Sequence, residues 1–360
     1  MSDLLYSEIE NDLRAGVREL LDDTCAWPDV LAGTEKDDPC DIALWRALAR
    51  MGTTGLPVPE DLGGAGATWR ETAVVMEELG RAVAPVPFLG AAVLAAAALL
   101  EAGDRALLPG LASGERIAVL AVPLGTAPHA PTGGTVRASG GALTGRVAGV
   151  AGGQEADVLL VPASDGLYAV NAADAGRTPV TSLDMTRRLC DLTFSAAPAE
   201  RIAGGAEAER AVRAALSTGA AMLASEQLGL AERCLAVTVE YLNTRYQFGR
   251  PVGSYQALKH RVADLWTSVA QMRAVARHAA GCAAAGDPGT AVAVAVAQAH
   301  CSAVVVRAAE ECVQMHGGIG FTWEHPAHLY LKRAKSSALA LGTPDRHRAA
   351  LAALADLPPA

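Results

Sequence analysis

The first third of the chain carries apolar residues at the spacing of amphipathic helices. Near the start they recur every three or four residues, at Leu5, Ile9, Leu13, Val17 and Leu20. This pattern predicts a helix over residues 4–21, and further helices are expected over 41–51, 68–80 and 90–102. Residues 56–66 are rich in Pro and Gly and cannot continue a helix. We therefore expect this part of the chain to be helical throughout.

The pattern changes after Ser113 and changes again near Arg201. Short β-type runs over 117–122, 156–161 and 167–170 are separated by clusters of Gly, Pro, Asp and Ser, which favours strands joined by turns. Long Ala-rich helical patterns then follow over 203–242, 254–281, 289–315 and 327–341. Long helices joined by short turns indicate a bundle.

The expected fold is mainly α with β. It consists of an N-terminal helical domain over residues 1–113, a central antiparallel β domain over 114–199 and a C-terminal four-helix bundle over 200–360. One continuous helical protein with a β insertion is the alternative, and it differs little in practice.

The composition limits the classes of partner. The chain has 360 residues, 51% of them hydrophobic, which is ample material for a large core. Its net charge of −9 argues against nucleic acid, because such a partner needs a basic face. The apolar stretch 89–100 is too short to span a membrane, and the run 291–306 is interrupted by Gln298 and His300. We expect no nucleic-acid and no membrane partner.

The cysteines indicate a reducing compartment. Seven cysteines are scattered without a CxxC pair, and the N-terminus lacks the charged and apolar regions of a secretion signal. This favours reduced thiols in the cytoplasm and no structural zinc.

Several short motifs are better explained by structure than by chemistry. His325 and His328 have metal-ligand spacing, but without a nearby partner a capping or solvated pair is the better interpretation, and no metal site is expected. The glycines of 63–66 lack the context of a phosphate loop and predict a plain turn. Glu77 and Glu78 are adjacent on a helix, point in different directions, and do not form a general acid–base pair.

Two segments are less ordinary. The first is Tyr-Leu-Asn-Thr-Arg-Tyr-Gln-Phe-Gly-Arg-Pro-Val-Gly-Ser-Tyr-Gln over 241–256, and the second is Val-Gln-Met-His-Gly-Gly-Ile-Gly-Phe-Thr-Trp-Glu over 313–324. Taken singly, Arg245 is explained as a cation near a helix C-terminus, and Gly317 and Gly318 as a helix stop. Their combination and order need a further explanation.

In combination these segments resemble the C-terminal domain of the acyl-CoA dehydrogenase family of flavoenzymes. The resemblance covers the whole chain. It extends to Trp45-x-x-Leu, to 56–66, to Met-Glu-Glu-Leu-Gly-Arg-Ala-Val-Ala-Pro-Val-Pro over 76–87 and to Ser-Gly-Glu over 113–115. The α–β–α order is also that of the family.

The resemblance implies a dimer-based enzyme in which FAD lies across a subunit interface. It implies that Arg245, Gln247 and Phe248 reach the pyrophosphate region of the FAD of the neighbouring subunit. Gln314, Gly317 and Gly318 are implied to approach the adenosine part. A guanidinium pairs well with a diphosphate, and glycine lets the backbone approach a ligand closely.

The sequence departs from the family where the family has its catalytic base. Most members carry a Glu before a Gly-Thr pair, and here Leu341 precedes Gly342 and Thr343. Other members carry the Glu on the first long helix of the bundle, at a position that falls here on Gly219 or Ala220. Neither position holds a proton acceptor, so no catalytic residue is assigned.

The flavin-ring contacts of the family are also absent. At the two corresponding places the chain has Ala-Val-Pro-Leu-Gly over 121–125 and Gly-Val-Ala over 149–151. Neither stretch offers the aromatic face or hydroxyl that holds an isoalloxazine ring in the family.

These departures predict an accessory subunit that completes the FAD site of a catalytic partner. Such a chain resembles one subunit of the α2β2 acyl-CoA dehydrogenases of actinobacterial steroid degradation, with an acyl-CoA substrate and an electron-transfer flavoprotein as further partners. The first alternative is an active homomeric dehydrogenase with a displaced base, for example Asp345 or Glu226. The second is a scaffold subunit without FAD contact.

Overall fold

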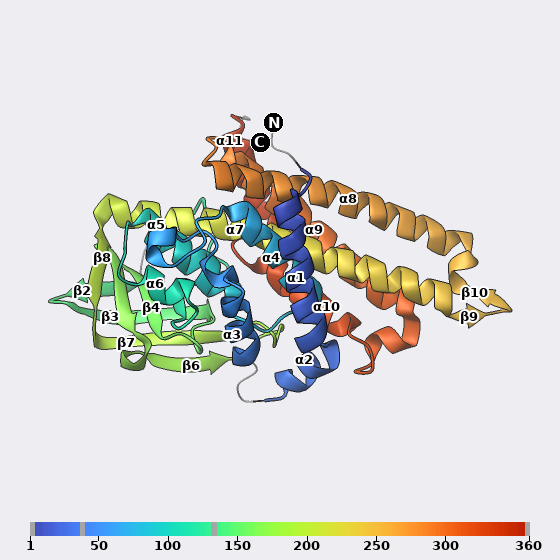
Figure 1. Ribbon diagram of the computed structural model, residues 1–360, viewed down its shortest axis with the longest axis horizontal. Helices are drawn as coiled ribbons and strands as arrows, with labels where there is room; N and C mark the ends of the chain where they lie inside the picture. The colour runs from blue at the N-terminus through green and yellow to red at the C-terminus, as the bar shows by residue number, and fades with distance from the viewer. Residues whose placement is uncertain (1–3, 37–39, 131–134, 357–360) are drawn as a thin grey trace.

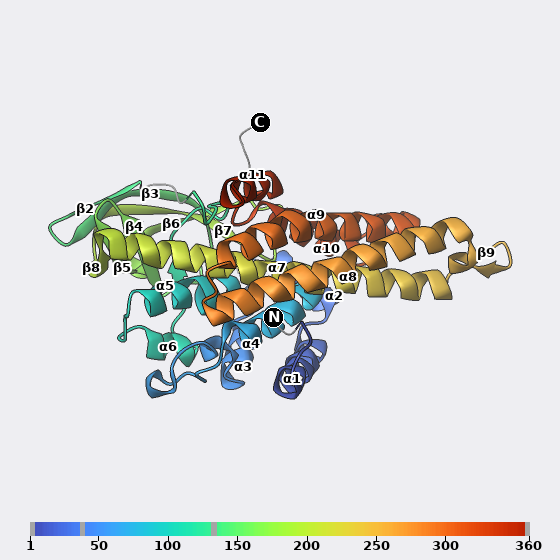
Figure 2. The ribbon, with the colours of Figure 1, turned by 90° about the horizontal axis from the view of Figure 1, so that it is seen from above.

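The computed structural model describes residues 4–36, 40–130 and 135–356. A β layer lies at one end of the elongated molecule, and a helical bundle extends to the other end (Figure 1). Seen from above, the N-terminal helices pack along one side of the bundle (Figure 2). The predicted fold, mainly α with a central β domain and a C-terminal helical bundle, is confirmed.

Capped helices make up the N-terminal part. The Ser7 hydroxyl accepts from the backbone N–H of Glu10, and the Glu10 carboxylate accepts from the N–H of Ser7, so this helix begins at Glu8, later than predicted. Thr68 and Glu71 start another helix in the same way. The helices are α1 (Glu8–Thr24), α2 (Trp27–Thr34), α3 (Ile42–Arg50), α4 (Trp69–Ala82), α5 (Ala96–Glu101) and α6 (Leu108–Ala112), with short helical segments η1 (Thr53–Gly55), η2 (Glu60–Leu62) and the π-helical η3 (Leu89–Ala95).

The β layer consists of two four-stranded sheets. The first has the order β1 (Ala118–Leu120), β4 (Val158–Ala163), β5 (Gly166–Asn171) and β8 (Glu200–Gly204). The second has the order β2 (Val136–Ser139), β3 (Ala142–Ala151), β7 (Leu189–Pro198) and β6 (Gly176–Val180). Because β8 pairs with β5, this layer continues to Gly204.

The prediction of a purely antiparallel domain is wrong for one pair of strands. β1 runs parallel to β4, with Val119 opposite Leu159. Between them the chain forms the antiparallel β2–β3 pair in the other sheet and returns from the same direction. A parallel pair needs a long connection of this kind, which a local sequence pattern does not show.

The four long helices of the C-terminal part lie within a few residues of their predicted limits. They are α7 (Gly205–Thr244), α8 (Gln256–Ala285), α9 (Thr290–His316) and α10 (Ala327–Leu339). α7 runs from the β layer to the far end of the molecule (Figures 1 and 2), and its residues 219–231 are all buried. A further helix, α11 (Pro344–Leu354), is capped by Thr343.

Two glycines let α4 and α7 cross in close contact. A β-carbon at Gly80 would lie 2.0 Å from the carbonyl oxygen of Glu226, and one at Gly229 would lie 1.7 Å from that of Glu77. Both distances are far below van der Waals contact. The crossing therefore requires glycine at both positions and fixes Glu226 against the end of α4.

One helical stretch among the described residues, Thr290–Phe321, has the length and hydropathy of a membrane span. Within its most apolar window 56% of the residues are buried inside the protein. The fully buried Gln298 donates its side-chain amide to the carbonyl oxygen of Ala220 at 2.6 Å. These contacts are those of a core helix of the bundle.

Candidate functional site

A hairpin at the far end of the bundle carries the first group of predicted cofactor residues. α7 ends at Thr244, and the chain then forms the short strands β9 (Tyr246–Gln247) and β10 (Arg250–Pro251). Phe248 and Gly249 form the turn with φ of +51° and +75°. Positive φ at both turn positions matches the twist of a tight hairpin. The hairpin projects from the end opposite to the β layer (Figures 1 and 2).

The second group lies beside the first. α9 ends at His316, where Gly317 adopts a φ of +62°, and the chain continues into η6 (Gly317–Phe321). Leu242, Val252 and Met315 form a small buried cluster that joins this end of α9 to the hairpin segment. The structure thus brings together the segments that carry the six residues predicted to bind cofactor, namely Arg245, Gln247, Phe248, Gln314, Gly317 and Gly318.

This end of the bundle is open to solvent. All six predicted residues are exposed, Phe248 to 90%. Among the described residues, no carboxylate pairs with the guanidinium of Arg245. Large exposed apolar side chains surround the group, namely Tyr246, Ile319, Phe321 and Trp323. A surface rich in aromatic side chains and arginine has the composition of a protein interface.

Three rings pack against one another next to this surface. The His316 ring lies 4.5 Å from the Tyr241 ring and 4.1 Å from the His325 ring, centre to centre. His316 Nδ1 also lies 2.6 Å from the carbonyl oxygen of Cys312. Burial first, and then the neighbouring positive groups, lowers the pKa of His325 to about 4.

The two positions where the family has its base meet at the other end of the bundle. Leu341 is fully buried, and its N–H donates to the carbonyl oxygen of Leu124 at 2.7 Å. A β-carbon at Gly219 would lie 3.2 Å from Leu341 Cδ1 and 2.3 Å from Leu94 Cδ2. Apolar side chains therefore fill the space at both positions, and Gly219 could not carry a longer side chain without displacing Leu94.

The predicted ring-contact segments lie at the same junction. Leu124 and Ala151 line a small cavity with Leu94, where the N-terminal helices, the β layer and the bundle meet. Its volume is about 50 Å³, room for a few water molecules. The residues at this junction therefore do not fit an isoalloxazine ring.

A cluster of four charged side chains, Asp184, Arg187, Glu226 and Arg333, lies at this cavity, whose lining also includes Glu155 and Arg188. Arg187 donates to both oxygens of Glu226 at 2.5 Å, and Arg333 donates to Asp184 at 2.6 Å. Burial would raise the pKa of Glu226, but Arg187 and Arg333 outweigh it and hold that pKa below its usual value. The same balance of burial against Arg333 and Arg187 lowers the pKa of Asp184.

The sequence singles out only Glu226 from this cluster, as a displaced base. The structure places it at the junction, but both carboxylate oxygens already accept hydrogen bonds from Arg187. Asp345, the other proposed base, is 91% exposed on α11 and pairs with Arg348 at 2.7 Å, outside the cavity lining. Neither carboxylate is arranged as a free proton acceptor.

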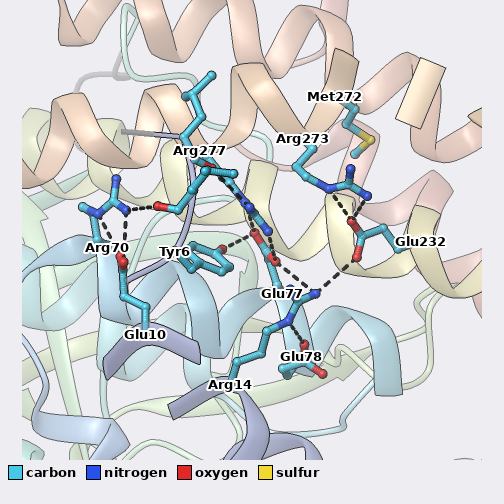
Figure 3. A network of polar contacts seen from close by, with 12 residues as sticks. Tyr6, Glu10, Arg14, Arg70, Glu77, Glu78, Glu232, Met272, Arg273 and Arg277 are labelled. Atoms are coloured by element: carbon cyan, nitrogen blue, oxygen red, sulfur yellow. Dashed lines mark hydrogen bonds and ion pairs between the residues drawn. The ribbon is translucent and has the colours of Figure 1, made fainter. Parts of the chain in front are cut away.

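The adjacent glutamates of α4 belong to a network of ion pairs (Figure 3). Glu77 accepts from the Tyr6 hydroxyl and lies 3.3 Å from Arg277, while Glu78 lies 2.8 Å from Arg14. Burial is the main cause that raises the pKa of Glu77. Arg14 lies between the two carboxylates, since it is also 3.6 Å from Glu77, so both are held in ion pairs and their exclusion as a general acid–base pair stays a prediction.

The histidines at 325 and 328 have structural roles. His325 Nδ1 accepts from the backbone N–H of Ala327 at 3.2 Å, at the start of α10, as a capping side chain does. Both ring nitrogens of His328 are buried without a hydrogen-bond partner among the described residues, so His328 is neither a cap nor solvated, and the prediction is wrong for it. The His328 ring packs edge-on against the ring of Trp323. Within residues 4–36, 40–130 and 135–356, no three His, Cys, Asp or Glu side chains gather as a metal site requires.

Comparisons with known proteins agree with these observations. Residues 7–115 match the acyl-CoA dehydrogenase N-terminal domain, and residues 209–355 match the C-terminal domain. The acyl-CoA dehydrogenase IpdE2 of Mycobacterium tuberculosis is 40% identical over 322 residues, which cover 88% of this chain and 87% of that protein.

Two solved structures have the same fold over nearly the whole chain. The ChsE4–ChsE5 complex from Mycobacterium tuberculosis matches with a TM-score of 0.89 at 29% identity, covering 100% of both chains. The Tcur3481–Tcur3483 steroid acyl-CoA dehydrogenase, in a G363A variant, matches with a TM-score of 0.86 at 31% identity, covering 97% of this chain and 98% of that one. The chain belongs to the acyl-CoA dehydrogenase family of oxidoreductases that act on CH–CH bonds and is similar to its steroid-type members.

Proposed function

We propose that this chain is the accessory subunit of an FAD-dependent acyl-CoA dehydrogenase and completes the FAD site of a different, catalytic subunit. The observation that carries the proposal is a contrast within the chain. Arg245 stands exposed on the hairpin, and among the described residues no carboxylate pairs with it, whereas Leu341 is sealed in the core. The chain thus has a cation, Arg245, free to bind an anionic ligand at its surface, but it has no proton acceptor at the position of Leu341.

The exposed end of the bundle has donors suited to the diphosphate and adenosine parts of FAD. The guanidinium of Arg245 can give paired hydrogen bonds to phosphate oxygens, and the exposed amides of Gln247 and Gln314 can add neutral ones. Gly317 presents backbone without a side chain, and no atom lies within 4 Å of where its β-carbon would be. When bound, FAD supplies the electron acceptor for α,β-desaturation of an acyl-CoA thioester.

The similar structures support the proposed partners. Two of the similar structures are named as pairs, ChsE4–ChsE5 and Tcur3481–Tcur3483, and the second is described as a steroid acyl-CoA dehydrogenase. By that similarity the partner is a second acyl-CoA dehydrogenase chain, and the substrate class is a steroid-type acyl-CoA. Electron transfer to an electron-transfer flavoprotein and a cytoplasmic location stay predictions.

The first test compares flavin content in the complex with the catalytic partner. Arg245→Ala removes a charged hydrogen-bond donor worth about 1.5–3 kcal/mol, and we expect FAD to bind about ten- to a hundredfold more weakly. Arg210→Ala is the matched control, because Arg210 is also exposed and lies near the other end of the same helix. The ratio of flavin to protein in the purified complex is the measurement.

Flavin binding, measured on the complex and on the chain alone, also separates the two alternatives. Unchanged flavin content in the Arg245→Ala complex contradicts the proposal and favours a scaffold without FAD contact. Tight FAD and turnover of an acyl-CoA by the chain alone would instead favour an active homomeric dehydrogenase with a displaced base.

A further inference from the structure

The four charges at the junction come from three separate parts of the chain. Asp184 and Arg187 lie on the connection between β6 and β7, Glu226 lies in the middle of α7, and Arg333 lies on α10. All four side chains are at most 9% exposed. With two positive and two negative charges, the cluster is neutral.

Arg333 joins the β layer to both groups of helices. Its Nε donates to Asp184, and its Nη2 donates to the Thr186 hydroxyl at 2.7 Å and to the carbonyl oxygen of Ala84 at 3.3 Å. Its Nη1 lies 3.7 Å from Glu226. One guanidinium therefore binds the β6–β7 connection, the end of α4 and α7 at once.

Arg187 enters the junction from the β layer and is fully paired there. It holds both oxygens of Glu226 and donates to the Ser337 hydroxyl at 3.1 Å, and that hydroxyl donates to Glu226 at 3.1 Å. Arg187 and Glu226 both line the cavity that is too small for an isoalloxazine ring. Their side chains occupy space between the β layer and the bundle that a ligand would need.

We propose that the side chains of the Arg187–Glu226 pair fill this cavity and thereby exclude flavin and acyl thioester from it. The same ion pair holds the β layer against the bundle when no ligand is bound. The pair satisfies its own charges, so the closed arrangement needs no cofactor. The assignment concerns only the chain's own cavity and does not depend on the role of Arg245.

The first test uses a double-mutant cycle in the full-length chain. Arg187→Met leaves the buried Glu226 with the Ser337 hydroxyl and, as its remaining positive charge, the more distant Arg333, and we expect the melting temperature to fall by roughly 5–10 °C. Adding Glu226→Met removes the stranded charge and leaves the Asp184–Arg333 pair intact, so we expect at least half of the loss to be recovered. No recovery in the double variant would overturn the assignment.

The second measurement reports directly whether the β6–β7 connection is held against the bundle. Hydrogen–deuterium exchange of residues 181–188 should rise in Arg187→Met and stay unchanged in the hairpin 245–251. Arg146→Met is the matched control, because Arg146 pairs with Asp191 on the solvent side of the same β layer. Exchange at 181–188 that is equal in Arg187→Met and the control contradicts a closing role.

The third measurement uses ligand probes on the wild-type chain alone. Lumiflavin carries the isoalloxazine ring without a diphosphate, and octanoyl-CoA carries the thioester. Neither should raise the melting temperature if the cavity is closed. A rise with either probe would overturn the inference while leaving the proposed role of Arg245 to its own test of flavin content.

Discussion

The two ends of the bundle both carry arginine side chains, but these differ in exposure and in ion pairing. At the hairpin end, Arg245 is exposed and, within the described part of the chain, has no ion-pair partner, and aromatic side chains around it face solvent. At the junction with the β layer, Arg187 and Arg333 are buried and paired with carboxylates. A charge left open at a surface is available to another molecule, whereas a charge closed by its own partners serves the fold.

The largest expected effect is at the closed end. Arg333→Leu removes the ion-pair partner of the buried Asp184 and also the longer contact to Glu226, which keeps Arg187, and we expect the free energy of unfolding to fall by about 3–5 kcal/mol. Urea unfolding of the full-length chain is the measurement. Arg348→Leu, which removes an exposed pair with Asp345, is the control and should change stability by less than about 1 kcal/mol.

Arg333→Lys keeps the comparison testable if the leucine variant does not fold. Lysine retains the charge but loses the fork of donors, so we expect an intermediate loss. Equal stability of Arg333→Lys, Arg348→Leu and the wild type would contradict a closed, charge-paired junction.

A smaller loss is expected where α4 crosses α7. Gly229→Ala places a methyl group 1.7 Å from the Glu77 carbonyl oxygen, which belongs to backbone that cannot rotate away. We expect a destabilisation of about 1–3 kcal/mol from this overpacking, measured by urea unfolding. Gly33→Ala on α2 meets nothing within 4 Å and should be neutral or stabilise by up to about 1 kcal/mol.

The acid dependence of stability distinguishes the paired carboxylates from ordinary ones. Since the pKa of Glu226 is lower in the folded chain, its stabilising contribution is complete above the usual carboxylate range near pH 4 and is lost as pH falls through the folded value. As pH is lowered below about 4, the urea midpoint of the Arg187→Met/Glu226→Met variant should therefore fall less steeply than that of the wild type. An identical acid profile in both proteins would contradict this account.

The buried Glu77 contributes to stability with the opposite pH dependence. Its raised pKa means that the folded chain binds its proton more readily than the unfolded chain, so its contribution to stability grows as pH falls. Because both proteins in the acid experiment retain Glu77, its contribution cancels in the comparison.

The smallest change in stability is expected at the open end. Phe248→Gly removes a side chain that is 90% exposed and relieves a φ of +51°, so we expect the lone chain to be unchanged or more stable by up to about 1 kcal/mol. Binding to the catalytic partner should weaken, because an aromatic contact is lost. Isothermal titration against the partner checks this, with the exposed Leu354→Ala as control.

Local patterns predict the parts of this molecule that depend on nearby residues. The long helices follow from Ala-rich apolar periodicity, and the hairpin residues follow from one continuous segment beside a helix end. The parallel pairing of β1 with β4 depends on a connection through the other sheet, so no local pattern reports it.

The charge cluster is hidden from the sequence for the same reason. Asp184, Arg187 and Arg333 each look like an ordinary surface charge in their own segment, and only the packing of β layer on bundle brings them together. Leu341 and Gly219 could be singled out by resemblance to the family. Their proximity in space, beside the cavity-lining Leu94, required the structure.

The central claim is that the flavin ring lies outside this chain while its diphosphate end is contacted by Arg245. The visible absorption spectrum of the purified chain, recorded alone and after mixing with its catalytic partner in the presence of FAD, tests it most directly. We predict a colourless chain alone and tightly bound flavin only in the mixture. A chain that is yellow by itself and oxidises an acyl-CoA would contradict the account.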